Sequence, residues 1–281
     1  MKSRLKSKGY QPAFLNGRFM EYYSLIHPDY KEKLTLCASS KTNYERYYAF
    51  PAILRRDANT LLIVYKNGLE HGNDAKDGLV KLDQLMLDIP TQCVINRSTV
   101  YAKPDMIPQM GEYVQMPNGD ICVYIDMQNS TYWGKRTGME YLRSTDGGMT
   151  YSNSTKFGVI DGVEYGYPLD SCYKNGRVYL LVMTFEYLQG SENRRQVHLI
   201  STGDNGQTWR FEANFTKKLG LEFNESSIVA LENGFALFTR GEAPRYRTNH
   251  GTDSEAENVL AVFDDEFNLL RVRDYRHTRC S

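Results

Sequence analysis

The chain has 281 residues, of which 41% are hydrophobic and 24% charged, a composition that suits a packed core and argues against disorder. Its formal net charge is zero, which argues against a general binder of nucleic-acid backbones. No apolar run approaches the roughly 20 residues of a membrane span. No apolar segment follows the basic residues 1–6, so we expect no secretory signal.

The first part of the chain predicts strands. Residues 1–45 contain Asn16-Gly17, a pair that favours a hairpin turn because both residues tolerate a positive φ. Residues 48–54 (YAFPAIL) and 61–65 (LLIVY) predict two further strands, joined at Ala58-Asn59. The polar stretch 70–78 (EHGNDAKDG) predicts a loop.

Asn-Gly pairs recur at a regular interval. Asn118-Gly119, Asn175-Gly176 and Asn233-Gly234 lie 57 and 58 positions apart, each between two apolar segments. Ala58-Asn59 precedes the first of them by 59 positions. A constant interval of this size indicates a repeat architecture.

A second marker has nearly the same period. Residues 144–151 (STDGGMTY) and 202–209 (TGDNGQTW) share the pattern [ST]-x-D-x-G-x-T-[WY], and Asp146 and Asp204 lie 58 positions apart. We expect degenerate copies at Asp83 and Asp265. In such a turn the Asp accepts backbone hydrogen bonds, Gly supplies a positive φ and the aromatic ring packs on the sheet. The predicted role is structural.

Together the markers define a unit of strand, tight turn, strand, variable loop and third strand. No segment has a sustained helical period, so the unit is all-β. Radial stacking lets such antiparallel sheets cover one another, which predicts a β-propeller of five or six four-stranded blades. We expect one domain over residues 1–281, with residues 1–45 closing the propeller. The repeats are expected near residues 46–104, 105–163, 164–221 and 222–281.

The inner strands of a propeller converge on its axis. Counting eight positions back from the Asn of each turn identifies equivalent inner-strand starts at Pro51, Met110, Tyr167 and Glu225. With their neighbours, the side chains expected to line the channel are Gln109, Tyr167, Asp170 and Glu225. An aromatic ring, an amide and carboxylates around a cleft suit a sugar.

These boxes resemble the Asp-box (BNR) repeats of the sialidase (neuraminidase) superfamily, and the likeness extends over residues 45–270. Residues 223–240 (FNESSIVALENGFALFTR) are similar to a family segment with a Glu at the start of an inner strand and an Arg on the next strand. The resemblance implies that Glu225 raises the basicity of a catalytic Tyr and that Arg240 binds the substrate carboxylate. It also implies that Asp74, or failing that Asp77, is the general acid/base.

The sequence departs from the family at several places. Ala49 stands where the family has its first Arg. Of Arg55 and Arg56 at most one points inward, because neighbours on a strand face opposite sides, and Arg56 is the candidate for substrate binding. The family's third Arg and its nucleophilic Tyr have no clear equivalent. Tyr246 and Tyr275 are candidates for the nucleophile that no motif supports.

The resemblance implies a glycoside hydrolase that releases a terminal sugar, sialic acid or another glycan unit, with Asp74 and Glu225 as catalytic residues. Sialidases use a Tyr nucleophile because their substrate is anionic. Loss of one Arg weakens recognition of an anion and leaves a neutral glycan open. The alternatives are a glycan-binding propeller without activity and a polysaccharide lyase that uses Tyr and His. We expect no cofactor and no metal.

Overall fold

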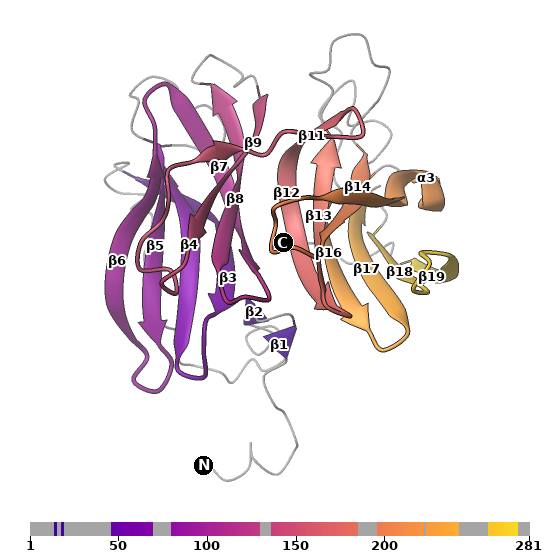
Figure 1. Ribbon diagram of the computed structural model, residues 1–281, viewed down its shortest axis with the longest axis horizontal. Helices are drawn as coiled ribbons and strands as arrows, with labels where there is room; N and C mark the ends of the chain where they lie inside the picture. Colours follow the sequence, from indigo (N-terminus) through magenta and orange to yellow (C-terminus); the bar gives the residue numbers. More distant parts are fainter. Residues whose placement is uncertain are drawn as a thin grey trace.

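A computed structural model of the chain describes residues 14–15, 18–19, 46–69, 80–129, 136–184, 196–221, 223–241 and 258–274. These residues form antiparallel strands in four sheets of four or five strands and one two-stranded sheet (Figure 1). The short helix α3 (Phe215–Leu219) follows the third large sheet. None of the described helical segments has the length and hydropathy that crossing a membrane requires.

The strands follow the chain from sheet to sheet. The first large sheet contains β3 (Tyr47–Arg55), β4 (Thr60–Gly68), β5 (Lys81–Asp88) and β6 (Cys93–Ala102). The second contains β7 (Met106–Gln115), β8 (Ile121–Asn129), β9 (Arg136–Ser144) and β10 (Thr155–Lys156). The third contains β11 (Val159–Ile160), β12 (Val163–Lys174), β13 (Arg177–Thr184), β14 (Val197–Thr202) and β15 (Arg210–Asn214). The fourth contains β16 (Phe223–Leu231), β17 (Gly234–Gly241), β18 (Asn258–Phe263) and β19 (Leu269–Asp274).

The innermost strands of the four sheets are β3, β7, β12 and β16. Contacts join β3 to β7, β7 to β12 and β12 to β16, so these four strands lie side by side around the axis. This arrangement confirms the predicted all-β propeller fold. The hairpin expected at Asn16-Gly17 is described as β1 (Phe14–Leu15) paired with β2 (Arg18–Phe19). The rest of residues 1–45, and with it the closure of the propeller, lies outside the described residues.

The hydrophobic core lies between neighbouring sheets. Leu62 of the first sheet and Val123 of the second are both fully buried in one cluster. Leu181 of the third sheet and Leu237 of the fourth are fully buried in another. Because each sheet is covered on a face by its neighbour, burial of apolar surface stabilises the stack of sheets rather than any single sheet.

The two eight-residue turns, 144–151 and 202–209, have the predicted local geometry. Asp146 accepts hydrogen bonds from the Thr150 hydroxyl (2.6 Å), the Thr150 amide (2.9 Å) and the Met149 amide (3.0 Å). Asp204 accepts the equivalent bonds from the hydroxyl (2.5 Å) and amide (2.9 Å) of Thr208. These bonds, first of all those from the threonine hydroxyls, lower the pKa of each Asp to about 2.

The predicted degenerate copies are misplaced. Asp83 lies inside β5, where it accepts a hydrogen bond from Thr99 (2.8 Å), and does not form a turn. In the fourth sheet Asp264, one position before the predicted Asp265, accepts hydrogen bonds from the amide (2.7 Å) and side chain (3.0 Å) of Asn268. Asp264 directly follows Phe263, the last residue of β18. In the earlier turns the Asp stands two positions after the last residue of the strand. The interval of 58 positions that separates Asp146 from Asp204 leads from Asp204 to position 262, two short of Asp264, so a fixed interval does not locate this turn.

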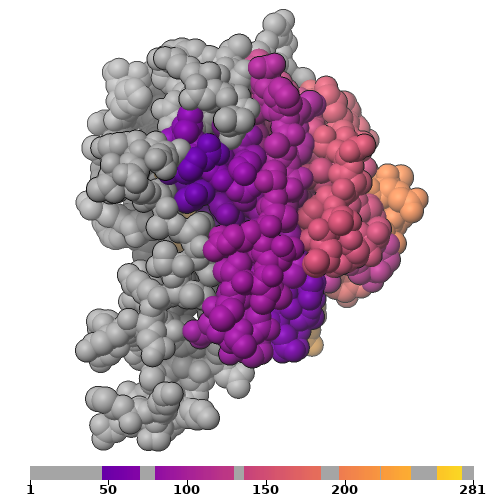
Figure 2. Space-filling model, turned by 90° about the vertical axis from the view of Figure 1, so that its left-hand side faces the viewer, coloured from indigo at the N-terminus to yellow at the C-terminus, as the bar shows by residue number. Residues whose placement is uncertain are grey.

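Each eight-residue turn is also bound to the preceding sheet. The Gly148 carbonyl accepts a hydrogen bond from the Gln84 amide of β5 (2.8 Å). The Asn205 carbonyl accepts one from the Arg143 guanidinium of β9 (2.5 Å). In Figure 2 the pink surface of the second sheet's later residues directly adjoins the purple surface of the first sheet. The turns thus connect sheets as well as strands.

Candidate active site

Each inner strand contains a β-bulge near its beginning. The pairing register shifts between Ala49 and Ala52, Pro108 and Met110, Pro168 and Asp170, and Phe223 and Ser226. An extra residue disrupts the ladder and re-aims the neighbouring side chains, as is common beside active sites. Three of the four bulges include a proline, which has no N–H to lose from the ladder. The bulges therefore give the four inner strands a shared irregular end.

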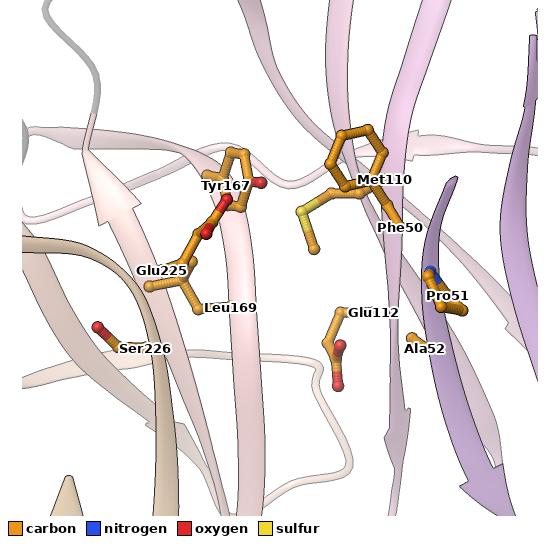
Figure 3. Close-up of a pocket in the computed structure, with 9 residues that line it drawn as sticks. All are labelled: Phe50, Pro51, Ala52, Met110, Glu112, Tyr167, Leu169, Glu225 and Ser226. Carbon is orange, nitrogen blue, oxygen red and sulfur yellow. The ribbon is translucent and has the colours of Figure 1, made fainter. Parts of the chain in front are cut away.

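A pocket of about 200 Å³ opens at these bulges (Figure 3). All four inner strands contribute to its lining, which includes Pro51, Met110, Tyr167 and Glu225. These are the four positions that the count from the tight turns identifies as equivalent. The repeat thus brings side chains from distant parts of the sequence together at the axis.

Glu225 lies at the mouth of the pocket and forms an ion pair. The Arg240 guanidinium donates a hydrogen bond to the Glu225 carboxylate at 2.6 Å, and the two side chains are 33% and 51% exposed. Glu225 is one of the bulge residues of β16, and Arg240 lies on the neighbouring strand β17. Glu225 and Tyr167 both line the pocket (Figure 3). Because the pair is exposed, water screens much of its attraction.

A second carboxylate, Glu112 of β7, was missed by the sequence reasoning. It lines the pocket and is only 3% exposed. A signal was available, because Glu112 stands two positions after Met110 and side chains two apart on a strand share a face. Phe50, the bulge residue of β3, also lines the pocket and has a φ of 52°. A non-glycine residue rarely adopts this left-handed conformation.

Gln109 and Asp170 do not line the pocket, although they flank residues that do. The Gln109 side-chain oxygen accepts a hydrogen bond from the buried Lys66 ammonium of the first sheet (3.0 Å). The Asp170 carboxylate accepts bonds from the amides of Ile228 (3.0 Å) and Ser171 (2.6 Å). Bulges change which side chains face the axis, so the neighbours of a lining residue cannot be assigned to the lining by position alone. Gln109 thus joins the first and second sheets, and Asp170 joins the third and fourth.

Arg56 lies away from the pocket. It follows the end of β3, where its guanidinium donates to Asp57 (2.8 Å) and Thr60 (3.2 Å). It also lies against Gly147 in the eight-residue turn of the next sheet. The prediction considered only which side of the strand Arg56 faces. The site, however, lies at the beginning of β3, and Arg56 at its end.

Several candidates lie outside the described residues, namely Asp74, Asp77, Tyr246 and Tyr275. Their predicted roles stay predictions. The described strand ends are relevant to Asp74, because the end of β4 pairs with the beginning of β3, Gly68 opposite Tyr47. The chain therefore leaves β4 at the same end of the sheet as the pocket.

A buried Tyr–His pair bears on the lyase alternative. The Tyr165 hydroxyl lies 3.1 Å from Nδ1 of His198, and both side chains are buried. Burial lowers the pKa of His198 to about 4. A polymer cannot reach this pair, so it does not provide lyase chemistry. Among the described residues, no three His, Cys, Asp or Glu side chains converge as metal ligands do.

Comparisons with known proteins identify the fold. No protein-family model and no curated protein matches the sequence. A solved protein of unknown function from Dyadobacter fermentans is similar with a TM-score of 0.61 and 16% identity, over 82% of this chain and 70% of that one. An α-L-arabinofuranosidase from Clostridium thermocellum has a TM-score of 0.51 and 9% identity, over 82% and 73%. The Trypanosoma rangeli sialidase solved with sialic acid has a TM-score of 0.51 and 11% identity.

The alignment with the Trypanosoma rangeli sialidase covers 79% of this chain and 37% of the sialidase chain. The described fold is therefore one that sialidases and arabinofuranosidases share. At these identities the likeness extends to the fold and no further.

Proposed function

We propose that this protein is a glycoside hydrolase that releases a terminal sugar unit, acting at the pocket where the inner strands converge. The observation that carries the proposal is the convergence of the four repeat-equivalent positions on one pocket that holds an aromatic ring and two carboxylates. Its volume of about 200 Å³ is below the roughly 300–1,000 Å³ of sites for drug-sized ligands, which suits a single sugar ring. The fold, shared with sialidases and arabinofuranosidases, supports the same class.

The chemistry assigns a role to each group. Glycoside cleavage requires an acid that protonates the leaving oxygen and a base or nucleophile on the other side of the sugar. We assign the first role to Asp74 and the second carboxylate to Glu225, with Arg240 holding Glu225 in place. The ring of Tyr167 provides a flat apolar surface for the C–H face of a sugar.

The charge of the lining favours a neutral sugar. Among the described lining residues, Glu112 and Glu225 are acidic and none is basic. Carboxylates accept hydrogen bonds from sugar hydroxyls, whereas they repel the carboxylate of a sialic acid. Together with Ala49 in place of the family's first Arg, this supports a neutral terminal unit over sialic acid.

The test is a panel of 4-nitrophenyl glycosides of neutral sugars, with a 4-methylumbelliferyl sialoside beside them. We expect turnover of at least one neutral glycoside and a loss of about 10²–10⁴-fold in Glu225→Gln. Glu232→Gln, in the exposed turn directly after the same strand, is the matched control and should keep wild-type turnover. Full turnover in Glu225→Gln, with the fold intact, would exclude the assignment.

A glycan-binding protein without hydrolysis is the second candidate. It is favoured by the Glu225–Arg240 ion pair at 2.6 Å, because the guanidinium already occupies the carboxylate that hydrolysis would need. The test is a glycan array followed by incubation with the glycan that binds. Binding without release of a sugar product would select this candidate.

A further inference from the structure

The ring of Tyr167 is supported from outside the pocket. The guanidinium carbon of Arg136 lies 5.2 Å from the centroid of the Tyr167 ring, within the range of a cation–π interaction. Arg136 begins β9 in the second sheet, whereas Tyr167 lies on β12 in the third. The contact therefore crosses the boundary between two sheets.

Arg136 is itself held by a buried acid. It forms an ion pair with Asp126 of β8, whose side chain is completely buried. Gln128 donates a further hydrogen bond to the same Asp126 oxygen (3.4 Å). Asp126 is the pairing partner of Met110, which lines the pocket. A buried carboxylate requires such partners, so this end of the arrangement is fixed.

The strand around Tyr167 is irregular, so the contacts of its side chain contribute to placing the ring. The pairing register shifts on both sides of it, between Tyr165 and Tyr167 and again between Pro168 and Asp170. A ring that must be ordered when a ligand binds costs affinity, whereas a ring ordered beforehand does not. The ring packs against the core cluster that the third and fourth sheets share, and the guanidinium over the ring adds a constraint from the second sheet.

We infer that Arg136 is a positioning residue: anchored by Asp126, it fixes the ring of Tyr167 as the platform on which a sugar stacks in the pocket. The sugar's contact with Tyr167 rests on the proposed function. The fixing of the ring does not, because it concerns the protein without ligand.

Arg136→Lys separates stacking from charge. Lysine can still pair with Asp126, but it lacks the planar group that stacks on a ring. Arg136→Met would remove this cation from the buried Asp126 carboxylate, and the variant could then fail to fold. The methionine substitution is therefore combined with Asp126→Asn, which removes the buried charge as well. Arg143→Lys is the matched control. Arg143 lies on the same strand, is 24% exposed against 21% for Arg136, and pairs with an acid, Asp120, at 2.7 Å.

The first measurement uses the unliganded full chain with ¹³C-labelled tyrosine, and Tyr167→Phe assigns the Tyr167 signal. We expect Arg136→Lys and the double variant Asp126→Asn/Arg136→Met to shift the Tyr167 ring signal and speed its ring flipping, and Arg143→Lys to do neither. An unmoved signal in Arg136→Lys, or an equal change in Arg143→Lys, would overturn the inference whatever the protein's activity is.

The second measurement uses the 4-nitrophenyl glycoside that the wild type hydrolyses. Arg136→Lys should raise KM about fivefold, the scale of one cation–π contact, and leave kcat within about twofold. In a Tyr167→Ala background the same change should have no further effect. If the panel yields no hydrolysis, the proposed function fails separately, and affinity for the glycan bound on an array replaces KM. Unchanged KM or affinity in Arg136→Lys would overturn the platform role.

Discussion

The two ends of the propeller are built by different rules. At the turn end, tight turns and eight-residue turns close the strands through hydrogen bonds between residues a few positions apart, such as Thr150 to Asp146 at 2.6 Å. At the pocket end, bulges interrupt the ladders and the contacts join distant positions, such as Tyr167 and Arg136 at 5.2 Å. The turn end therefore supplies stability, whereas the side chains at the pocket end can differ without loss of the fold.

The largest effect is expected at the turn end, for Gly234→Ala. Gly234 has a φ of 119°, and an added Cβ would lie 1.9 Å from the backbone oxygen of Phe263. We expect a loss of about 3 kcal/mol or more in the free energy of unfolding, measured by urea denaturation. Gly119→Ala is the control, with a φ of 91° but open space around the added atom. Equal losses would show that backbone strain, and not the clash, dominates.

A smaller loss is expected for Lys174→Met. The buried Lys174 ammonium donates to the carbonyls of Leu231 (2.8 Å), Glu232 (3.1 Å) and Gly234 (3.1 Å) in the turn of the fourth sheet. Removing hydrogen bonds from a charged donor should cost about 2–3 kcal/mol in urea denaturation. Asp265→Asn, which removes only the exposed partner of Lys174, should cost less than about 1 kcal/mol. The reverse order would assign the stability to the ion pair.

The eight-residue turns predict acid sensitivity. The pKa of Asp146 is about 2 when folded, against 3.8 for an unperturbed Asp, so the stability it contributes is complete above pH 4 and is lost as the pH falls through 2. We expect the Tm of Asp146→Asn to be lower by a few degrees at pH 7 and to approach the wild-type value near pH 2. A constant difference for Asp146→Asn would contradict the assignment.

The smallest effect on stability is expected at the pocket, for Glu225→Gln. Its ion pair with Arg240 is exposed, and exposed pairs contribute roughly 0–1 kcal/mol. Urea denaturation should therefore barely change while turnover falls. A loss above about 2 kcal/mol would mean that the pocket end is structural too, and the distinction between the two ends would fail.

The turn end could be predicted from the sequence because its geometry is local. Asn175 and Gly176 have φ values of 49° and 78°, the positive values that the Asn-Gly signal predicts. The partners of Asp146 all lie within four positions of it, so a short pattern carries the whole structure. The count of eight positions from these turns then located Tyr167 and Glu225 in the pocket lining.

The pocket end was predicted less well because packing between sheets determines its bulges. Gln109 and Asp170 were assigned to the lining as neighbours of the counted positions, whereas their side chains bind partners on other sheets, Lys66 and Ile228. The prolines at the bulges were a usable signal, since proline is confined to such irregular positions within sheets. Glu112 could have been found as well, by continuing two positions along β7 from Met110 on the same face of the strand.

The bonds from Gln84 to Gly148 and from Arg143 to Asn205 have a consequence for how the molecule comes apart. The first sheet holds the eight-residue turn of the second and the second holds that of the third, so losing one of these sheets removes an anchor of its successor. Denaturation should then proceed as one cooperative transition, with coincident curves from tyrosine fluorescence and circular dichroism, rather than as independent melting of separate modules.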